Sequence, residues 1–267
     1  MIRPKHFVIE IEATTDCNRQ CSFCRPCMLR KDVEHPAYLA EADLAGLLAD
    51  LAACGYTGWI SYCGHGEPLL HPRVSELLKA TKAALPGCKV LVTTNGDFLT
   101  AAWLRENGPY LDNICWDCYA DDRTSIEVPL AVRASGFPAD KVAVIDCTVR
   151  PGSYWLSRAG TGWKSERAPA MRKAPCLNPR GKIFYSARGC FCLCCNDGQR
   201  RMSRQCGLQA WLSDAEYVRA CEDLTKGFRE PYPQCLECEY RGAPKRWPDR
   251  GLTGMFPTID KTRFWPK

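Results

Sequence analysis

The sequence lacks long apolar segments. It contains no run of about eighteen apolar residues, the length that a membrane-spanning helix needs, and Met1 to His6 carry no apolar signal-peptide segment. No segment recurs at a fixed period, which excludes repeat architectures. These absences predict a cytoplasmic protein.

The 267-residue chain also lacks the features of a disulfide scaffold. With 46% hydrophobic residues it can bury one large domain and a small satellite. Its 19 cysteines are an odd number in a chain without an export signal, whereas disulfide scaffolds are short secreted domains. Reduced thiols that serve metal clusters fit this composition better.

The net charge of +6 is unevenly distributed. Twelve Arg or Lys residues and two acidic residues lie between Arg150 and Arg204, so this span carries +10 and the rest of the chain −4. A basic span can contact phosphates, but this one lacks the regular aromatic interleaving that base stacking requires. A zinc-binding nucleic-acid module is therefore only a remote alternative, and neither nucleic acid nor a membrane is an expected partner.

Strand and helix patterns alternate through the first 150 residues. The pattern of 6–13 is that of a strand with Glu10 and Glu12 on one face. Further strands are predicted over 57–62, 89–94, 112–118 and 142–149, and helices over 37–54, 72–85, 100–107 and 124–135. Five parallel strands and four helices predict an α/β fold, an open partial TIM-like barrel with its chemistry at the carboxyl ends of the strands.

Three thiols follow the first predicted strand. Cys17, Cys21 and Cys24 are separated by three and two residues. Three thiolates do not complete a tetrahedral zinc site, but a [4Fe-4S] cluster held by three cysteines keeps one iron open for another ligand. A zinc knuckle with His35 as the fourth ligand is the alternative, and Cys27 is interpreted as a bystander.

This triplet resembles the radical S-adenosylmethionine (SAM) superfamily, in which SAM chelates the open iron and its cleavage yields a 5′-deoxyadenosyl radical. Gly64-His65-Gly66-Glu67-Pro68 resembles the superfamily's Gly-Gly-Glu-Pro segment, from which His65 departs, and Thr94-Asn95-Gly96 resembles its Thr-Asn-Gly turn. The cofactor-binding residues that the resemblance implies are Phe23, Gly64, Gly66, Glu67, Pro68, Thr94 and Asn95.

A second cysteine group resembles the SPASM/twitch extension of that superfamily. It contains Cys176, Gly189, Cys194, Cys235 and Cys238, and Cys195 competes with Cys194 as a ligand. Four thiolates complete a [4Fe-4S] cluster that carries electrons, although a four-cysteine zinc ribbon has similar spacing. No dense cysteine set follows, so one auxiliary cluster is expected.

The predicted organisation has four parts. They are a radical SAM partial barrel (1–150), a linker and active-site segment (151–175), a twitch domain (176–240) that includes a capped helix over 213–227, and a tail packing on the barrel (241–267). Within the linker, Arg158 lies in an Arg-Ala-Gly segment that in related enzymes places its arginine near SAM and substrate. The alternative is a solvated arginine.

The resemblance implies a radical SAM oxidoreductase of the kind found in antibiotic biosynthesis. An external one-electron donor such as flavodoxin or ferredoxin reduces the first cluster, and the radical takes hydrogen from an alcohol of a small sugar- or aminocyclitol-like molecule, anionic or polyhydroxylated. Loss of a proton and of an electron to the auxiliary cluster gives a ketone. Glu10, Glu12 and Arg158 are the candidates to assist proton loss.

Two other outcomes stay open. If a thiol returns hydrogen to the substrate, the enzyme is an epimerase. Its donor candidates are Cys63, Cys118 and Cys147, near the carboxyl ends of predicted strands, and the alternative is that these are buried structural thiols. A peptide-modifying enzyme is the other outcome, but a strand that begins by Phe7 leaves no room for the usual N-terminal winged helix.

Overall fold

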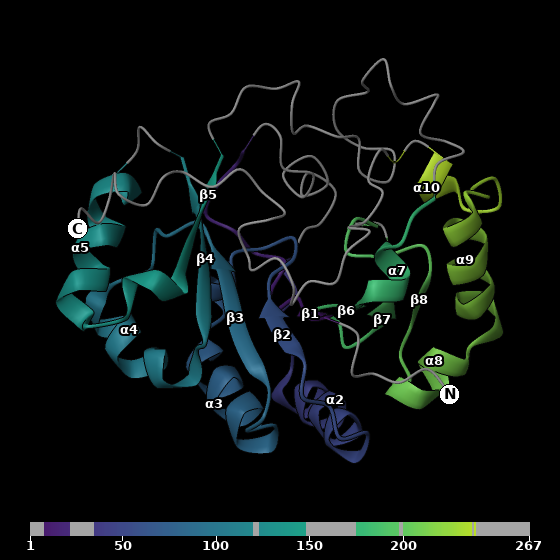
Figure 1. The fold of residues 1–267 in the computed structure, drawn as a ribbon, viewed down its shortest axis with the longest axis horizontal. Coiled ribbons are helices and arrows are strands. Elements are labelled where there is room, and N and C mark those ends of the chain that lie inside the picture. Colours follow the sequence, from purple (N-terminus) through teal and green to yellow (C-terminus); the bar gives the residue numbers. More distant parts are fainter. Residues whose placement is uncertain are drawn as a thin grey trace.

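The computed structural model describes residues 8–21, 35–119, 123–147, 175–197, 200–236 and 238. Within them lies an eight-stranded sheet with the order β5-β4-β3-β2-β1-β6-β7-β8 (Figure 1). The strands β1 to β6 pair in parallel, whereas β7 and β8 are antiparallel to their neighbours. The strands are β1 (Val8–Ile11), β2 (Trp59–Tyr62), β3 (Lys89–Thr94), β4 (Asn113–Cys118), β5 (Val142–Asp146), β6 (Lys182–Tyr185), β7 (Phe191–Cys192) and β8 (Ser203–Arg204).

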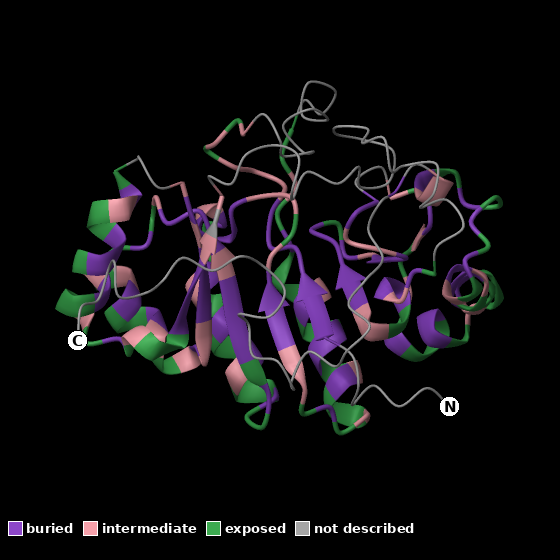
Figure 2. Cartoon of the chain, turned by 45° about the horizontal axis from the view of Figure 1, so that its top comes forward, coloured by how far each residue is buried: buried purple, intermediate pink, exposed green. Residues whose placement is uncertain are grey.

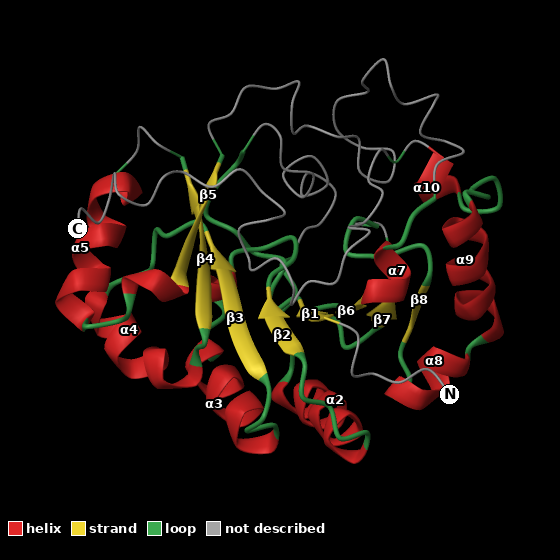
Figure 3. Cartoon of the chain, in the orientation of Figure 1, coloured by secondary structure: helices red, strands yellow, loops and turns green. Residues whose placement is uncertain are grey.

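Helices follow β1 to β4 and cover the outer face of the sheet, while the C-terminal helices gather beyond β6 (Figure 3). The α-helices are α2 (Glu41–Ala53), α3 (Val74–Ala84), α4 (Ala101–Asn107), α5 (Thr124–Ser135), α7 (Asn178–Gly181), α8 (Leu208–Ser213), α9 (Ala215–Lys226) and α10 (Pro233–Leu236). Short 3-10 turns are η3 (Pro68–Leu70), η4 (Gly108–Tyr110) and η5 (Ala139–Lys141). None of the described helices is long and apolar enough to cross a membrane.

Alternation along the strands separates two faces of the sheet. Ile9, Ile60 and Ile114 belong to the large core beneath the helices. The opposite, inner face carries a small cluster that includes Leu91 and Cys115. Figure 2 shows the central strands largely buried, in purple. Some polar residues of the inner face, such as Glu10 and Ser61, are buried.

The predicted α/β class with a mostly parallel sheet is confirmed. The strand over 89–94 and the helix over 124–135 have the predicted bounds, and α5 continues through Pro129. Thr100 caps α4 as predicted, because its hydroxyl accepts a hydrogen bond from the Trp103 N–H at 3.1 Å.

One parallel strand was missed. Lys182–Tyr185 forms β6 beside β1, so the parallel part of the sheet has six strands rather than five. A four-residue strand within a cysteine-rich segment is too short to show a clear period-two pattern. The sheet thus continues into 176–240, and the boundaries predicted at 150, 175 and 240 remain predictions.

Candidate active site

The cysteine loop begins where β1 ends. Cys17 and Cys21 are both partly exposed there, and the backbone N–H of Arg19 points at the Cys17 sulfur over 3.5 Å. The Cys21 sulfur lies 3.6 Å from the Tyr119 hydroxyl, beyond the end of β4. Phe23, Cys24 and Cys27 lie outside the described residues. The two described thiols therefore lie at the carboxyl edge of the sheet, where the predicted site belongs.

A polar network fixes this loop to the end of β3. The Arg19 guanidinium donates to both carboxylate oxygens of Asp97 at 2.7 Å, and Asn95 donates to Asn18 at 2.9 Å. Burial raises the pKa of Asp97, but hydrogen bonds from Arg19 and Asn18 outweigh it and lower that pKa overall. Arg19 also lies 4.3 Å above the Tyr119 ring. Asn95 was predicted as a cofactor-binding residue, but these pairings were not predicted, because the side chains come from separate loops.

Glu67 joins the ends of β2 and β3. One carboxylate oxygen accepts from the Leu69 N–H (3.1 Å) and the Thr94 hydroxyl (2.8 Å), and the other accepts from the Asn95 N–H (2.8 Å). Burial raises the pKa of Glu67 to about 7, against these three donors. The hydrogen bonds of Glu67 thus hold together the predicted cofactor residues Glu67, Pro68, Thr94 and Asn95.

The two glycines of the Gly-His-Gly-Glu-Pro segment permit close chain packing. A Cβ atom on Gly66 would lie well under 3.0 Å from the carbonyl oxygens of Thr14 and Asp16, just before the cysteine loop. Gly64 has a φ of +137°, and a Cβ atom there would lie 2.9 Å from the Glu12 Cβ. The glycines were predicted to allow close approach to a cofactor, whereas their described neighbours are in the chain itself.

Replacing Gly66 with alanine should destabilise the protein by about 1–3 kcal/mol, because the added methyl group must displace backbone rather than a flexible side chain. The matched control is Gly46→Ala in α2, where a Cβ meets nothing within 4 Å. That change should be neutral or stabilising by up to about 1 kcal/mol. Urea unfolding of both variants measures the difference, and equal stability would contradict the packing argument.

Buried charges occupy the inner face near β1. Glu12, 0% exposed, binds the Arg200 guanidinium, His65 Nδ1 at 3.0 Å and the Ala187 N–H at 3.0 Å. Burial raises the pKa of Glu12, but its bond to His65 and the charges of His65 and Arg200 outweigh this and lower the pKa to about 2. Such a carboxylate is a weak proton acceptor, so the structure does not favour Glu12 as the base.

Glu10 differs from Glu12. It is 6% exposed and forms an ion pair with Lys182 through Oε1. Its other oxygen, Oε2, is buried and has no hydrogen-bond partner among the described residues. Glu10 therefore keeps an acceptor on the inner face.

The three candidate donor thiols divide between the two faces. Cys118, 0% exposed, belongs to the core beneath the helices, as do Ile114 and Trp116 of the same strand face. The prediction that it faces the barrel interior is therefore wrong, because strand alternation turns it outward. Cys63 and Cys147 follow β2 and β5 in the inner-face register, and both are partly exposed. Arg158 lies outside the described residues.

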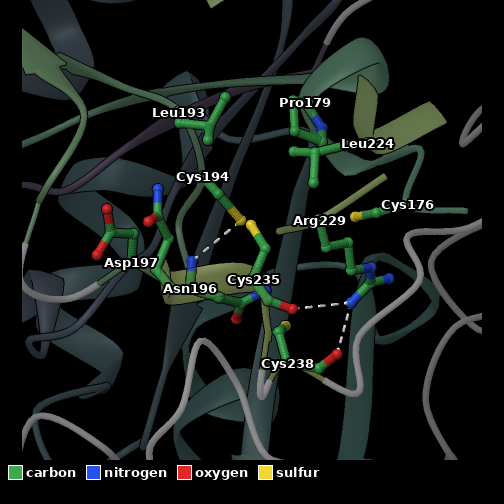
Figure 4. Close-up of a pocket in the computed structure, with 11 residues that line it drawn as sticks. Cys176, Pro179, Leu193, Cys194, Asn196, Asp197, Leu224, Arg229, Cys235 and Cys238 are labelled. Atoms are coloured by element: carbon green, nitrogen blue, oxygen red, sulfur yellow. Dashed lines mark hydrogen bonds between the residues drawn. The ribbon is translucent and has the colours of Figure 1, made fainter. Parts of the chain in front are cut away.

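The four predicted auxiliary ligands line one pocket (Figure 4). Cys176 precedes α7, Cys194 follows β7, Cys235 lies in α10, and Cys238 comes shortly after it. The fold thus brings together thiols from distant parts of the sequence.

Cys194, rather than Cys195, lines this pocket. The Cys194 sulfur accepts from the Asn178 side chain at 2.9 Å and from the Asn196 N–H at 3.3 Å, whereas the Cys195 sulfur is 3.9 Å from the same Asn178 nitrogen. A hydrogen bond with Cys194, and then burial, raise the pKa of Cys195 well above its usual value. This geometry favours Cys194 as the ligand, as does the spacing of four residues between Gly189 and Cys194, which resembles that of the twitch extension.

The pocket fits an iron–sulfur cluster. Burial raises the pKa of Cys176 to about 11, and burial together with the neighbouring Cys238 and Cys176 thiols raises that of Cys235. Among the residues described, no three His, Cys, Asp or Glu side chains are arranged to hold a single metal ion. A cubane offers each thiolate a separate iron, so its ligands need not converge on one point. This arrangement favours a cluster over a zinc ribbon.

Comparisons with known proteins define a class. No protein-family model matches the sequence. The S-adenosylmethionine-dependent nucleotide dehydratase of Lacinutrix mariniflava is 32% identical over 119 residues, 43% of this chain and 24% of that relative. The GTP 3′,8-cyclase of Geobacter sulfurreducens is 28% identical over 195 residues, 60% of this chain and 59% of that relative. The chain thus spans less than two thirds of these relatives, and its resemblance to radical SAM enzymes is confirmed.

A particular relative is the S-adenosyl-L-methionine-dependent 2-deoxy-scyllo-inosamine dehydrogenase of Niallia circulans, 30% identical over 93 residues (35% of this chain and 36% of that relative). It is also the enzyme that the sequence resembles in its length below 300 residues and in the predicted five-strand barrel and single auxiliary cluster. The crystal structure of BtrN in complex with AdoMet and 2-DOIA matches with a TM-score of 0.73 at 19% identity, over 90% of this chain and 96% of that one. The chain therefore has the BtrN fold.

Proposed function

We propose that this chain is a radical SAM dehydrogenase that oxidises a secondary alcohol of a small sugar- or aminocyclitol-like molecule to a ketone. The observation that carries the proposal is the pocket of four cysteines beside the parallel sheet, in a relative of a SAM-dependent dehydrogenase. A cluster completed by four thiolates has no open iron, so it is suited to take up an electron.

Each motif of the predicted barrel has a separate task in this proposal. Cys17, Cys21 and Cys24 would hold the first cluster, and SAM bound there, with flavodoxin or ferredoxin as the electron donor, would supply a 5′-deoxyadenosyl radical. Glu67 fixes the ends of β2 and β3, and so shapes the surface that faces SAM. Asn95 connects this surface to the cysteine loop through Asn18.

The substrate hydroxyl must lose a proton while the carbon loses an electron. Glu10 is the preferred acceptor, because Oε2 is buried on the inner face without a hydrogen-bond partner among the described residues. Glu12 is held ionised by Arg200 and His65 and ranks below it. Arg158 and its basic neighbours bind anionic or vicinal oxygens of the substrate, for which a planar guanidinium is suited.

In deuterium oxide, the product should be lighter than the substrate by two hydrogen atoms. One hydrogen leaves carbon as an atom and the other leaves oxygen as a proton, and no solvent hydrogen is returned to that carbon. Mass spectrometry of 2-deoxy-scyllo-inosamine treated with SAM and dithionite, after exchange back into ordinary water, makes the measurement. A product with the substrate's mass, or with one deuterium at carbon, would overturn dehydrogenation and point to Cys63 or Cys147 as the donor in an epimerase.

A further inference from the structure

A buried cation lies in the wall of the auxiliary pocket. Arg229 is 1% exposed and follows α9 in the sequence. Among the described residues that line the pocket it is the only basic one. Burying a guanidinium is unfavourable unless hydrogen bonds and nearby negative charge offset the lost hydration. Its position therefore places a buried positive charge in the lining of the four-cysteine pocket.

The guanidinium bonds directly to the chain that carries two of the thiols. Its Nη1 donates to the carbonyl oxygens of Cys235 at 3.3 Å and Cys238 at 2.6 Å (Figure 4). One nitrogen thus bridges both residues and fixes the turn between them. Because the contacts are to backbone oxygens, Arg229 leaves both sulfurs available for iron.

The acidic residue of the pocket offsets this charge only in part, because its effect on the Cys235 thiol is smaller than that of Arg229. Asp197 is 0% exposed, and one of its oxygens accepts from the Arg201 N–H at 2.8 Å. Figure 4 shows its carboxylate turned away from the thiols. Four thiolates around a cubane carry more negative charge than its irons and sulfides neutralise, and among the described residues of the pocket lining Arg229 is the cation that faces this charge.

We propose that Arg229 is a positioning residue that presents Cys235 and Cys238 to the auxiliary cluster and raises its reduction potential. The inference rests on the proposed function, because it requires that cluster. Reduction adds a negative charge, and a buried positive charge nearby stabilises the reduced form. Net charge and hydrogen bonding around the sulfurs are the means by which proteins set cluster potentials.

The test compares Arg229→Gln and Arg229→Lys with Arg204→Gln. Arg204 lies in the same C-terminal part, but its side chain is 45% exposed, so this control removes the same charge at the surface. Each full-length protein is reconstituted anaerobically, its iron is counted, and both clusters are titrated potentiometrically with detection by electron paramagnetic resonance.

Arg229→Gln should lower the equilibrium constant for reduction of the auxiliary cluster at least tenfold, which is a shift of its reduction potential by about −59 mV. The reduction potential of the SAM cluster should not change. Arg229→Lys should keep most of the wild-type potential, and Arg204→Gln all of it. If the glutamine variant fails to load, wild-type potential in the lysine variant supports the charge role. Loss of the auxiliary cluster from both variants would support the positioning role, whereas full loading of Arg229→Gln with an unchanged potential would overturn the proposal. A wild-type protein with about four irons would instead refute the proposed function.

Discussion

Replacing Cys17, Cys21 and Cys24 with alanine should remove about four of about eight irons and abolish SAM cleavage. The two described thiols of this triplet lie at the carboxyl edge of the sheet, where Asn18 and Arg19 anchor their loop to Asp97. The anchoring uses side chains other than the thiols, so the fold should survive the change. Iron and sulfide analysis, with chromatography of 5′-deoxyadenosine, measures both effects.

The matched variant replaces Cys176, Cys194, Cys235 and Cys238. It should also lose about four irons, yet keep SAM cleavage with dithionite and lose product formation. Cys195→Ala is the control, because this thiol lies outside the pocket lining and its loss should leave the iron count unchanged. Full product yield from the four-cysteine variant would refute an electron-transfer role. Purified protein with zinc and no iron would refute the radical SAM proposal as a whole.

Local patterns were sufficient to predict most elements of the barrel. Thr100 and Gly136 mark helix ends through a hydroxyl cap and a left-handed φ of 76°, and each acts within its own turn of chain. Glu67 was identified from its motif, but the hydrogen bonds that fix its carboxylate come from donors in η3 and β3. Motif spacing thus locates such a residue, whereas its partners appear only in the fold.

The sequence patterns did not predict the contacts between distant segments. Arg229 gives no signal in a chain with 36 Lys and Arg residues, and only its burial separates it from the others. Cys118 was misplaced because strand ends leave the register of the last residues undefined in sequence. One step along a strand reverses the face of a side chain.

Glu12 contacts both the barrel and the C-terminal part of the chain, whose strands β1 and β6 pair in one sheet. The predicted strand placed it on a polar inner face, which is correct. Its partners come from the Gly-His-Gly-Glu-Pro segment, from the turn after β6 and from the segment before β8. His65, which departs from the superfamily's glycine, is therefore explained by a contact to Glu12. One carboxylate connects the predicted SAM-binding segment to the half of the chain that carries the auxiliary pocket.

Replacing Glu12 with glutamine should destabilise the protein by about 3–5 kcal/mol, because Arg200 loses its charged partner in a buried site. Glu41→Gln is the control. The carboxylate of Glu41 pairs with Arg73 but is 46% exposed, so its loss should cost less than about 1 kcal/mol. Urea unfolding at neutral pH measures the free energy of unfolding of both variants. Equal losses would contradict the argument that the buried ion pair of Glu12 and Arg200 stabilises the fold.

The difference between wild type and Glu12→Gln should also depend on pH. The folded pKa of Glu12 is about 2, below its ordinary 4.5, so the ionised carboxylate contributes its full stability above about 4.5. That contribution is lost progressively as the pH falls from 4.5 toward 2, because the unfolded chain then binds a proton that the folded chain does not. Unfolding free energies of the two proteins should therefore converge on acidification, and a gap that stays constant below pH 4.5 would show that the charge of Glu12 is not what stabilises the fold.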